Sequence, residues 1–281
     1  MGKEDTIPKL LRKSFREYGD KRIALRRKDL GIWNEYTWKD YHSHVKYFSL
    51  GLISLGFKPG DRIAIIGDND PEYYWAEIAA QAACGSSVGI FTDSVSEEVK
   101  YIIVDSESSF VVSQDQEQVD KMLNIKDEVP NVKKVIYWDP KGLWFYDEPW
   151  IMGFNSVEEL GKSYGNIHPD IFDLNIEKGK GSDTAVLCYT SGTTGLPKGV
   201  VLSFDNVIGC SKGWLGVDPW HTDDDYLSFL FPWKDGHLFD VNTPVSVSVP
   251  YGLVILEDEI SIGLEPELLD KSDDELFRVL G

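Results

Sequence analysis

The residue pattern best suited to chemistry is a short segment between Tyr189 and Gly199 that is rich in glycine and hydroxyl side chains. Its three glycines let the backbone turn sharply, so that successive N–H groups can point into one concavity. Hydroxyls and one ammonium group add further donors, and the candidate binding positions are Thr190, Ser191, Gly192, Thr193, Thr194, Gly195 and Lys198. Backbone donors, hydroxyls and a mobile cation together suit a polyphosphate. The segment is therefore predicted to hold the phosphates of a nucleotide.

The spacing within this segment excludes a Walker A loop. Two residues separate Gly195 from Lys198, and Gly199 rather than Ser or Thr follows the lysine. The Walker A pattern requires glycine directly before the lysine and a hydroxyl residue after it. A P-loop GTPase or kinase is therefore not expected. A plain hairpin turn is the alternative, although a turn has no need for so many hydroxyls beside a lysine.

The elements expected upstream of this loop alternate between strands and helices. Short apolar runs over Arg62–Ile66, Ser87–Phe91, Phe110–Ser113 and Lys134–Trp138 predict strands, and Pro71–Cys84, Val95–Asp105 and Gln116–Lys126 predict helices. This alternation is typical of βαβ units around a parallel sheet. The runs lack polar alternation because parallel strands are covered on both faces. The expected fold class is therefore α/β, with a parallel sheet and flanking helices.

The chain divides into four expected regions of one domain. Residues 1–60 predict a helix from Ile7, a hairpin in which Ile23–Lys28 and Ile32–Thr37 flank Asp29-Leu30-Gly31, and a second helix capped by Thr37. Residues 61–138 form the parallel-sheet unit, and 139–182 form a long connection with a short helical stretch near 157–161. Residues 183–281 hold the phosphate loop, expected to lead into a second sheet, and a divergent acidic tail.

The charge of the chain limits which classes of binding partner are expected. Asp and Glu number 47 against 28 Lys and Arg, a net charge of −19, although residues 1–60 carry 13 basic and 7 acidic side chains. An acidic body repels phosphate backbones, so no nucleic-acid partner is expected. The clusters Arg12-Lys13 and Arg26-Arg27-Lys28 suit an anionic lipid surface or, more simply, solvated faces of a helix and a hairpin.

Three cysteines without CxxC spacing indicate neither a disulfide framework nor a metal knuckle. No run approaches the about 18 apolar residues that a membrane span needs. A cytoplasmic location is therefore expected, with peripheral contact at a membrane as an extension of it. Cys188, in the strand that enters the loop, is expected to be a core thiol, and His42 and His44 are expected on the surface.

The loop resembles the phosphate-binding motif of the AMP-forming adenylating superfamily, which includes acyl-CoA synthetases, luciferases and nonribosomal adenylation domains. The resemblance extends to Gly60–Asn69, which looks like the family's first parallel-sheet unit, and covers roughly residues 7–231. Gly89–Ser94 and Asp115–Lys121 resemble the long-chain fatty acyl-CoA ligase branch in particular. The fold then corresponds to part of the large N-terminal domain of such an enzyme.

The resemblance implies a two-step reaction with ATP, Mg²⁺ and coenzyme A. A fatty-acid carboxylate attacks the α-phosphate of Mg-ATP, pyrophosphate leaves, and the acyl-adenylate then reacts with the coenzyme A thiol. Charge neutralisation during in-line attack at phosphorus is the physical requirement. By motif match, the loop residues named above would hold the β- and γ-phosphates that depart.

Several family motifs have no match in this sequence. Tyr251-Gly252 lacks the Thr-Glu pair that assists magnesium, and neither the ribose-binding aspartate nor the lysine of the C-terminal domain is found. His237 lies where relatives line the acyl pocket and is a weak candidate for that role. We therefore expect a truncated or divergent ligase that is weakly active alone. A nucleotide-binding pseudoenzyme or regulatory module is one alternative, and half of a split ligase completed by a second chain is the other.

Overall fold

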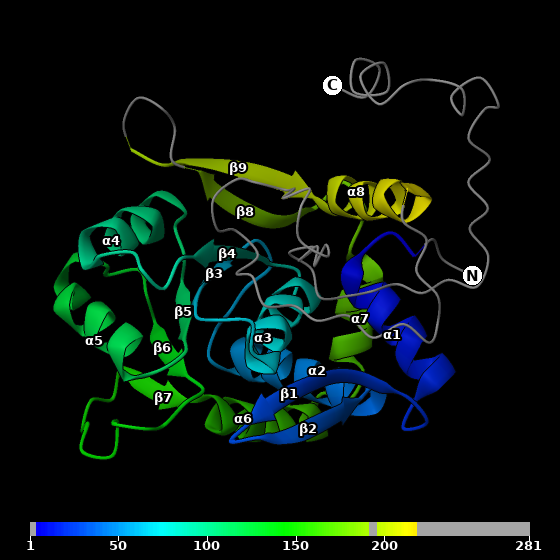
Figure 1. Cartoon of the computed structure of the whole chain (residues 1–281), viewed down its shortest axis with the longest axis horizontal. Coiled ribbons are helices and arrows are strands. Elements are labelled where there is room, and N and C mark those ends of the chain that lie inside the picture. Colours follow the sequence, from blue (N-terminus) through cyan, green and yellow to red (C-terminus); the bar gives the residue numbers. More distant parts are fainter. Residues whose placement is uncertain (1–3, 191–195, 218–281) are drawn as a thin grey trace.

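A single mixed sheet organises the protein. The computed structural model describes residues 4–190 and 196–217 (Figure 1). Within them, seven strands pair in the order β7-β6-β5-β3-β4-β8-β9, and every pairing is parallel except that of β8 with β9. The strands are β3 (Arg62–Ile66), β4 (Ser86–Ile90), β5 (Phe110–Ser113), β6 (Lys134–Tyr137), β7 (Ile151–Gly153), β8 (Thr184–Thr190) and β9 (Lys198–Ser203). The expected α/β class with a mainly parallel sheet is confirmed.

Helices cover both faces of this sheet (Figure 1). Successive residues of β3 show why, because Ile63 and Ile65 join one apolar cluster while Ala64 and Ile66 join another. The first cluster packs against α2 (Trp38–Ser54), α3 (Pro71–Ala82) and α6 (Phe154–Ile167), and the second against α4 (Ser96–Asp105) and α5 (Gln116–Asn124). Among the helices within the described ranges, none is both long and apolar enough to cross a bilayer.

The N-terminal region follows the sequence-based expectation. It consists of α1 (Ile7–Tyr18), the two-stranded hairpin β1 (Ile23–Asp29) and β2 (Ile32–Thr37), and then α2. Thr37 and Asp40 form a capping box, in which the Asp40 amide donates to Thr37 Oγ1 at 3.2 Å and the Thr37 amide donates to Asp40 Oδ2 at 2.9 Å. The predicted cap of α2 is therefore confirmed.

The expectation of a largely irregular connection over 139–182 is wrong. This region contains β7, α6 and α7 (Ile171–Lys178). Helix α6 packs so closely on α2 that a Cβ atom added at Gly161 would lie 1.8 Å from the Tyr47 carbonyl oxygen. In the sequence, glycines in this region suggest a loop. In the structure, Gly161 lets two helices touch, and this role depends on the tertiary contact.

The expectation of a second sheet after the loop is also wrong for the described residues. Strand β8 adds to β4 in parallel, and β9 returns antiparallel on β8 within the same sheet before α8 (Phe204–Val217). One apolar cluster joins members of all four expected regions, including Ile7, Ile63, Phe172 and Ile208. The boundaries after residues 60, 138 and 182 remain predictions, and the acidic tail 218–281 lies outside the described residues.

Candidate phosphate-binding site

The predicted phosphate loop leaves the sheet at its carboxyl edge. Thr190 is the last residue of β8 and Lys198 is the first residue of β9, and the two are register partners at the end of the β8–β9 ladder. Because β8 runs parallel to β4, the loop lies at the same edge as the segment that follows β4. Ligands of open α/β sheets bind outside the carboxyl ends of the strands. The two described ends of the loop, Thr190 and Lys198, are therefore placed where this type of fold binds ligands.

Helix α4 braces the hairpin that carries the loop. Tyr101 and Asp105 are four residues apart on α4 and share one face. The Tyr101 hydroxyl donates to the Pro197 carbonyl oxygen at 3.0 Å, and the Tyr189 hydroxyl donates to Asp105 Oδ2 at 2.6 Å. Burial and this hydrogen bond raise the pKa of Tyr189, so its phenol remains the donor. Both ends of the loop are thus tied to one rigid helix.

Sequence reasoning missed this brace. The partners lie 96 and 84 positions apart in the chain, so only the tertiary structure brings them together. The one available signal is the pair of polar residues at i and i+4 on the helix that follows β4.

Lys198 has the electrostatic setting of an anion ligand. Its side chain is exposed, and within residues 4–190 and 196–217 no carboxylate lies within ion-pair distance of its ammonium group. Thr190, directly opposite, is exposed as well. Among the described residues, therefore, no ion pair of Lys198 has to be broken before its ammonium group binds a phosphate.

The other predicted site residues fall outside the described ranges. These are Ser191, Gly192, Thr193, Thr194 and Gly195 in the loop, and His237 in the tail. Their roles remain predictions. The structure thus brings together the two residues that frame the loop, Thr190 and Lys198, and adds Tyr101 and Asp105 as supports.

The other segments that carried the resemblance meet along the same edge. Lys121 of α5 donates through Nζ to the carbonyl oxygen of Thr92, which lies in the turn after β4. The Asp68 amide after β3 donates to Gln114 Oε1 after β5 at 2.8 Å. Segments far apart in the chain therefore form one continuous set of loops beside the candidate site.

Cys188 and the two histidines of α2, His42 and His44, have packing roles in the structure. Cys188 is buried, and burial raises the pKa of its thiol to about 12, which agrees with the expected core thiol. The expectation of surface histidines is wrong, because both are half-buried. His42 stacks on Phe15 with ring centroids 4.1 Å apart, and His44 stacks on Trp75 at 3.7 Å. Their aromatic packing could not be read from helical spacing alone.

No metal centre is formed by the part of the chain that the structure describes, since no group of three or more His, Cys, Asp or Glu side chains there is placed to hold an ion. Mg²⁺ in nucleotide sites is typically bound by substrate phosphates with one or two carboxylates.

Comparison with known proteins identifies the family. A family model described as AMP-binding enzyme matches residues 11–258. The chain belongs to the AMP-binding enzyme family, as the resemblance of its loop predicts. This assignment covers the parallel-sheet unit, the connection and the phosphate loop.

Curated relatives that match the chain are named long-chain-fatty-acid–CoA ligases. The ACSBG2 ligase of Xenopus laevis is 32% identical over 202 residues, which are 72% of this chain and 26% of the relative. The human ACSBG1 ligase is 30% identical over 205 residues, which are 72% of this chain and 27% of the relative. The chain thus spans about a quarter of the length of the curated relatives it matches.

Solved structures confirm the fold. The anthranilate CoA ligase AuaEII, in complex with anthranoyl-AMP, superposes with a TM-score of 0.63 at 20% identity, covering 76% of this chain and 37% of that protein. A long-chain-fatty-acid-CoA ligase from Archaeoglobus fulgidus superposes with a TM-score of 0.64 at 16% identity, covering 80% and 41%. At these identities the likeness concerns the fold.

Proposed function

We propose that this chain supplies the phosphate-binding part of an enzyme that activates a carboxylic acid with ATP. The acid is a long-chain fatty acid, the first product is the acyl-adenylate, and coenzyme A is the acceptor. Family membership and the names of the curated relatives support the reaction class. The single observation that carries the proposal is the position of Thr190 and Lys198, opposite each other where the loop leaves the carboxyl edge of the sheet.

The proposed chemistry requires the loop to bind the part of ATP that departs. Pyrophosphate accumulates negative charge as the carboxylate attacks the α-phosphate, and Lys198 with the loop donors would neutralise that charge. The brace from Tyr101 and Asp105 holds the loop ends in place before the nucleotide binds. Preorganised donors stabilise such charge better than donors that must first be ordered.

The direct test is nucleotide binding by the whole chain. Titration calorimetry with Mg-ATP and with inorganic pyrophosphate compares the natural chain with Lys198→Ala. Losing one charge-assisted contact of about 1.5–3 kcal/mol predicts a 10- to 100-fold weaker affinity. Lys212→Ala on α8, an exposed lysine away from the loop, is the matched control and should bind as the natural chain does. Equal affinities for all three proteins would refute the phosphate role of the loop.

Catalysis is tested separately from nucleotide binding, by measuring pyrophosphate release. We propose weak or no pyrophosphate release from Mg-ATP with a fatty-acid panel, since the family's magnesium, ribose and carboxylate motifs have no match in this sequence. Binding without release favours a nucleotide-binding module. Release that appears only when a second polypeptide is added favours a split ligase, and robust release by this chain alone would overturn our interpretation of the unmatched motifs.

A further inference from the structure

The β1–β2 hairpin ends in an unusual apolar tip. Its two-residue turn is Leu30-Gly31, and Leu30 is 96% exposed. The neighbouring Ile32 is 69% exposed and Trp33 is 51% exposed. Three large apolar side chains are therefore exposed at the end of a narrow ribbon, with the consecutive residues Ile32 and Trp33 on its opposite faces. Such groups at a surface commonly mark a site of interaction.

Local structure does not account for the choice of leucine in this turn. Leu30 has φ = 47° and Gly31 has φ = 86°, which are the left-handed conformations of a two-residue hairpin turn. Asn or Asp is preferred at the first of these positions, because a leucine there strains its backbone. Leucine at this position thus serves neither the turn nor the core, and its exposed side chain is available to a partner.

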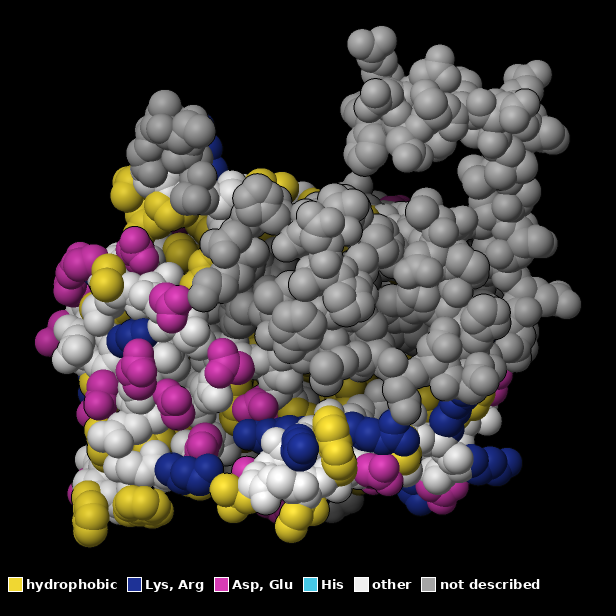
Figure 2. All heavy atoms as spheres, viewed as in Figure 1, with side chains coloured by type: hydrophobic (Ala, Val, Ile, Leu, Met, Phe, Trp, Pro, Cys, Tyr) yellow, Lys and Arg dark blue, Asp and Glu magenta, His cyan; other side chains and the backbone are white. Residues whose placement is uncertain are grey.

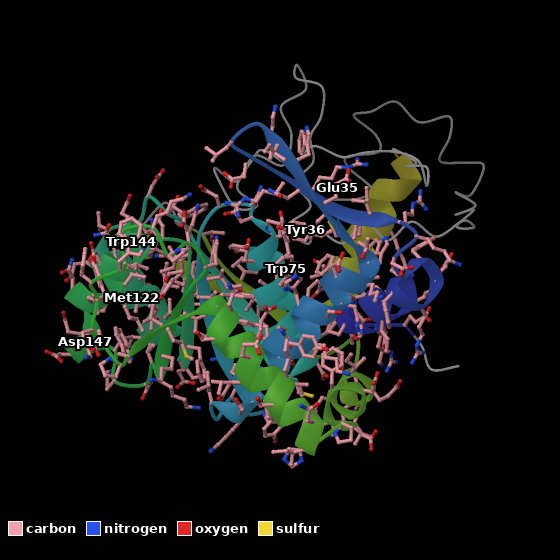
Figure 3. All side chains as sticks on the ribbon, turned by 90° about the horizontal axis from the view of Figure 1, so that it is seen from below. Glu35, Tyr36, Trp75, Met122, Trp144 and Asp147 are labelled. Carbon is pink, nitrogen blue, oxygen red and sulfur yellow. The ribbon has the colours of Figure 1, made fainter. Side chains whose placement is uncertain are left out.

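Contacts from both strands attach the hairpin to the body. Arg27 forms ion pairs with Asp70 at 3.0 Å and with Glu72 at 3.6 Å, close to the start of α3. Tyr36 of β2 packs edge-on against Trp75 of α3, with ring centroids 5.2 Å apart (Figure 3). The tip is therefore presented by a fixed support.

Charge around the tip favours an anionic partner. The hairpin segment 21–36 carries five basic and two acidic side chains in a protein of net charge −19. Lys28 is exposed and lies 5.6 Å from the ring centroid of Trp33, and the exposed Arg26 pairs with Glu35 at 3.1 Å. Figure 2 shows Lys and Arg side chains gathered along the hairpin, with apolar side chains below them. In contrast, Arg12 of the other basic cluster is buried against Asp173 and Glu177.

We propose that the β1–β2 hairpin docks the protein on an anionic lipid bilayer. Leu30, Ile32 and Trp33 enter the headgroup region, and Lys28 and Arg26 contact lipid phosphates at its edge. Exposed apolar side chains supply the affinity, basic residues add attraction to the negative surface, and tryptophan is favoured at such interfaces. The acidic remainder of the protein is repelled by the same surface, which sets the orientation. This proposal does not depend on the nucleotide role of the loop.

The test is cosedimentation of the whole chain with sucrose-loaded vesicles. One set contains phosphatidylcholine alone, and the other contains about one third phosphatidylglycerol, which supplies a negative surface. We expect binding to the second set, weakened when salt is raised from about 0.05 to about 0.5 M. Absence of binding to the anionic vesicles would overturn the proposal.

Leu30→Asn is the decisive variant. Asparagine tolerates the left-handed turn, so the melting temperature should not fall, whereas vesicle binding should weaken about tenfold through loss of the apolar side chain. Leu174→Asn removes another exposed leucine, 54% exposed against 96% for Leu30, from α7 and should leave vesicle binding unchanged. Equal losses in the two variants, or none in either, would contradict docking through the hairpin.

Charge and self-association are tested separately. Each basic charge that is removed should weaken binding to anionic vesicles about fivefold, so the double variant R26Q/K28Q should weaken it by more than tenfold. Any binding to phosphatidylcholine vesicles should be unchanged. Analytical ultracentrifugation without lipid detects the competing occupant, a second copy of the chain. Dimerisation that requires Leu30, with no binding to anionic vesicles, would assign the tip to a protein interface and reject the membrane proposal.

Discussion

Glu77 gives a sharp test of the packing described above. It lies on α3, which is covered on all sides, and its Oε1 accepts a hydrogen bond from the Ser87 hydroxyl at 3.2 Å. Burial raises its pKa from 4.5 to about 8, and the bond from Ser87 offsets only part of this effect. The native protein therefore holds a protonated carboxyl where the unfolded chain holds a charged one.

The sign of the resulting pH dependence follows from proton binding. Between pH 4.5 and 8 the native state holds one more proton at Glu77 than the unfolded state, so the free energy of unfolding falls as pH rises. His42 acts in the opposite direction, because burial lowers its pKa from 6.5 to about 4. The contribution of neutral His42 to the free energy of unfolding is therefore complete above pH 6.5 and is lost as pH falls toward 4. Of these two residues, Glu77 therefore determines the pH dependence of the free energy of unfolding between pH 6.5 and 8.

The perturbation is Glu77→Gln, which keeps the shape and can still accept from Ser87 but does not ionise. At about 1.4 kcal/mol per pH unit, the stability of the variant relative to the natural protein should grow by about 2 kcal/mol between pH 6.5 and 8. Urea unfolding at a series of pH values measures this difference. Glu98→Gln, at an exposed site on α4, should show no such trend. Parallel pH profiles for the natural protein and Glu77→Gln would refute the buried, protonated carboxyl.

Three further outcomes follow from the contacts. Gly161→Ala should destabilise the protein by about 3 kcal/mol or more in urea, because a Cβ there meets backbone, whereas Gly209→Ala on α8 has open space and should stabilise it by about 0.5–1 kcal/mol. Phe48→Ala should cost about 3–5 kcal/mol, since its ring is fully buried, and a loss below about 1 kcal/mol would contradict that packing. Tyr101→Phe should weaken Mg-ATP binding about threefold in calorimetry without lowering the melting temperature, through loss of the bond to Pro197, and unchanged affinity would show that the brace does not serve the loop.

Much of the fold could be predicted because its signals are local. The alternation of strands and helices appears in the sequence as apolar runs separated by amphipathic segments. A parallel strand can be recognised as buried from its own apolar run, without knowing which strand it pairs with. The Thr37 cap and the hairpin around Asp29-Leu30-Gly31 are encoded within a few residues each, and the structure confirms both, except that Asp29 pairs with Ile32 and leaves Leu30-Gly31 as the turn. The phosphate role of the segment from Thr190 to Lys198 also follows from local composition and spacing, over about ten residues, and stays a prediction.

The errors arose where one segment depends on another. Helix α6 carries Gly161 at its contact with α2, so glycines that weaken helix propensity in the sequence are favoured by the close approach of two backbones. Strand β9 joins the first sheet because β8 adds to β4, a pairing between segments about a hundred residues apart. No local pattern states which sheet edge a strand will join.

The sequence by itself determined the class of fold and the family, and it predicts a phosphate role for the segment from Thr190 to Lys198, because hydrophobic period, turn chemistry and motif spacing act over short distances. The tertiary structure decided which groups meet: Tyr101 with the loop, Glu77 within the core, and Arg27 with the start of α3 beneath an exposed hairpin tip. The physical reason is that burial, ion pairing and exposure depend on which residues are neighbours in space. Residues that are far apart along the chain become neighbours only when the sheet and its helices pack.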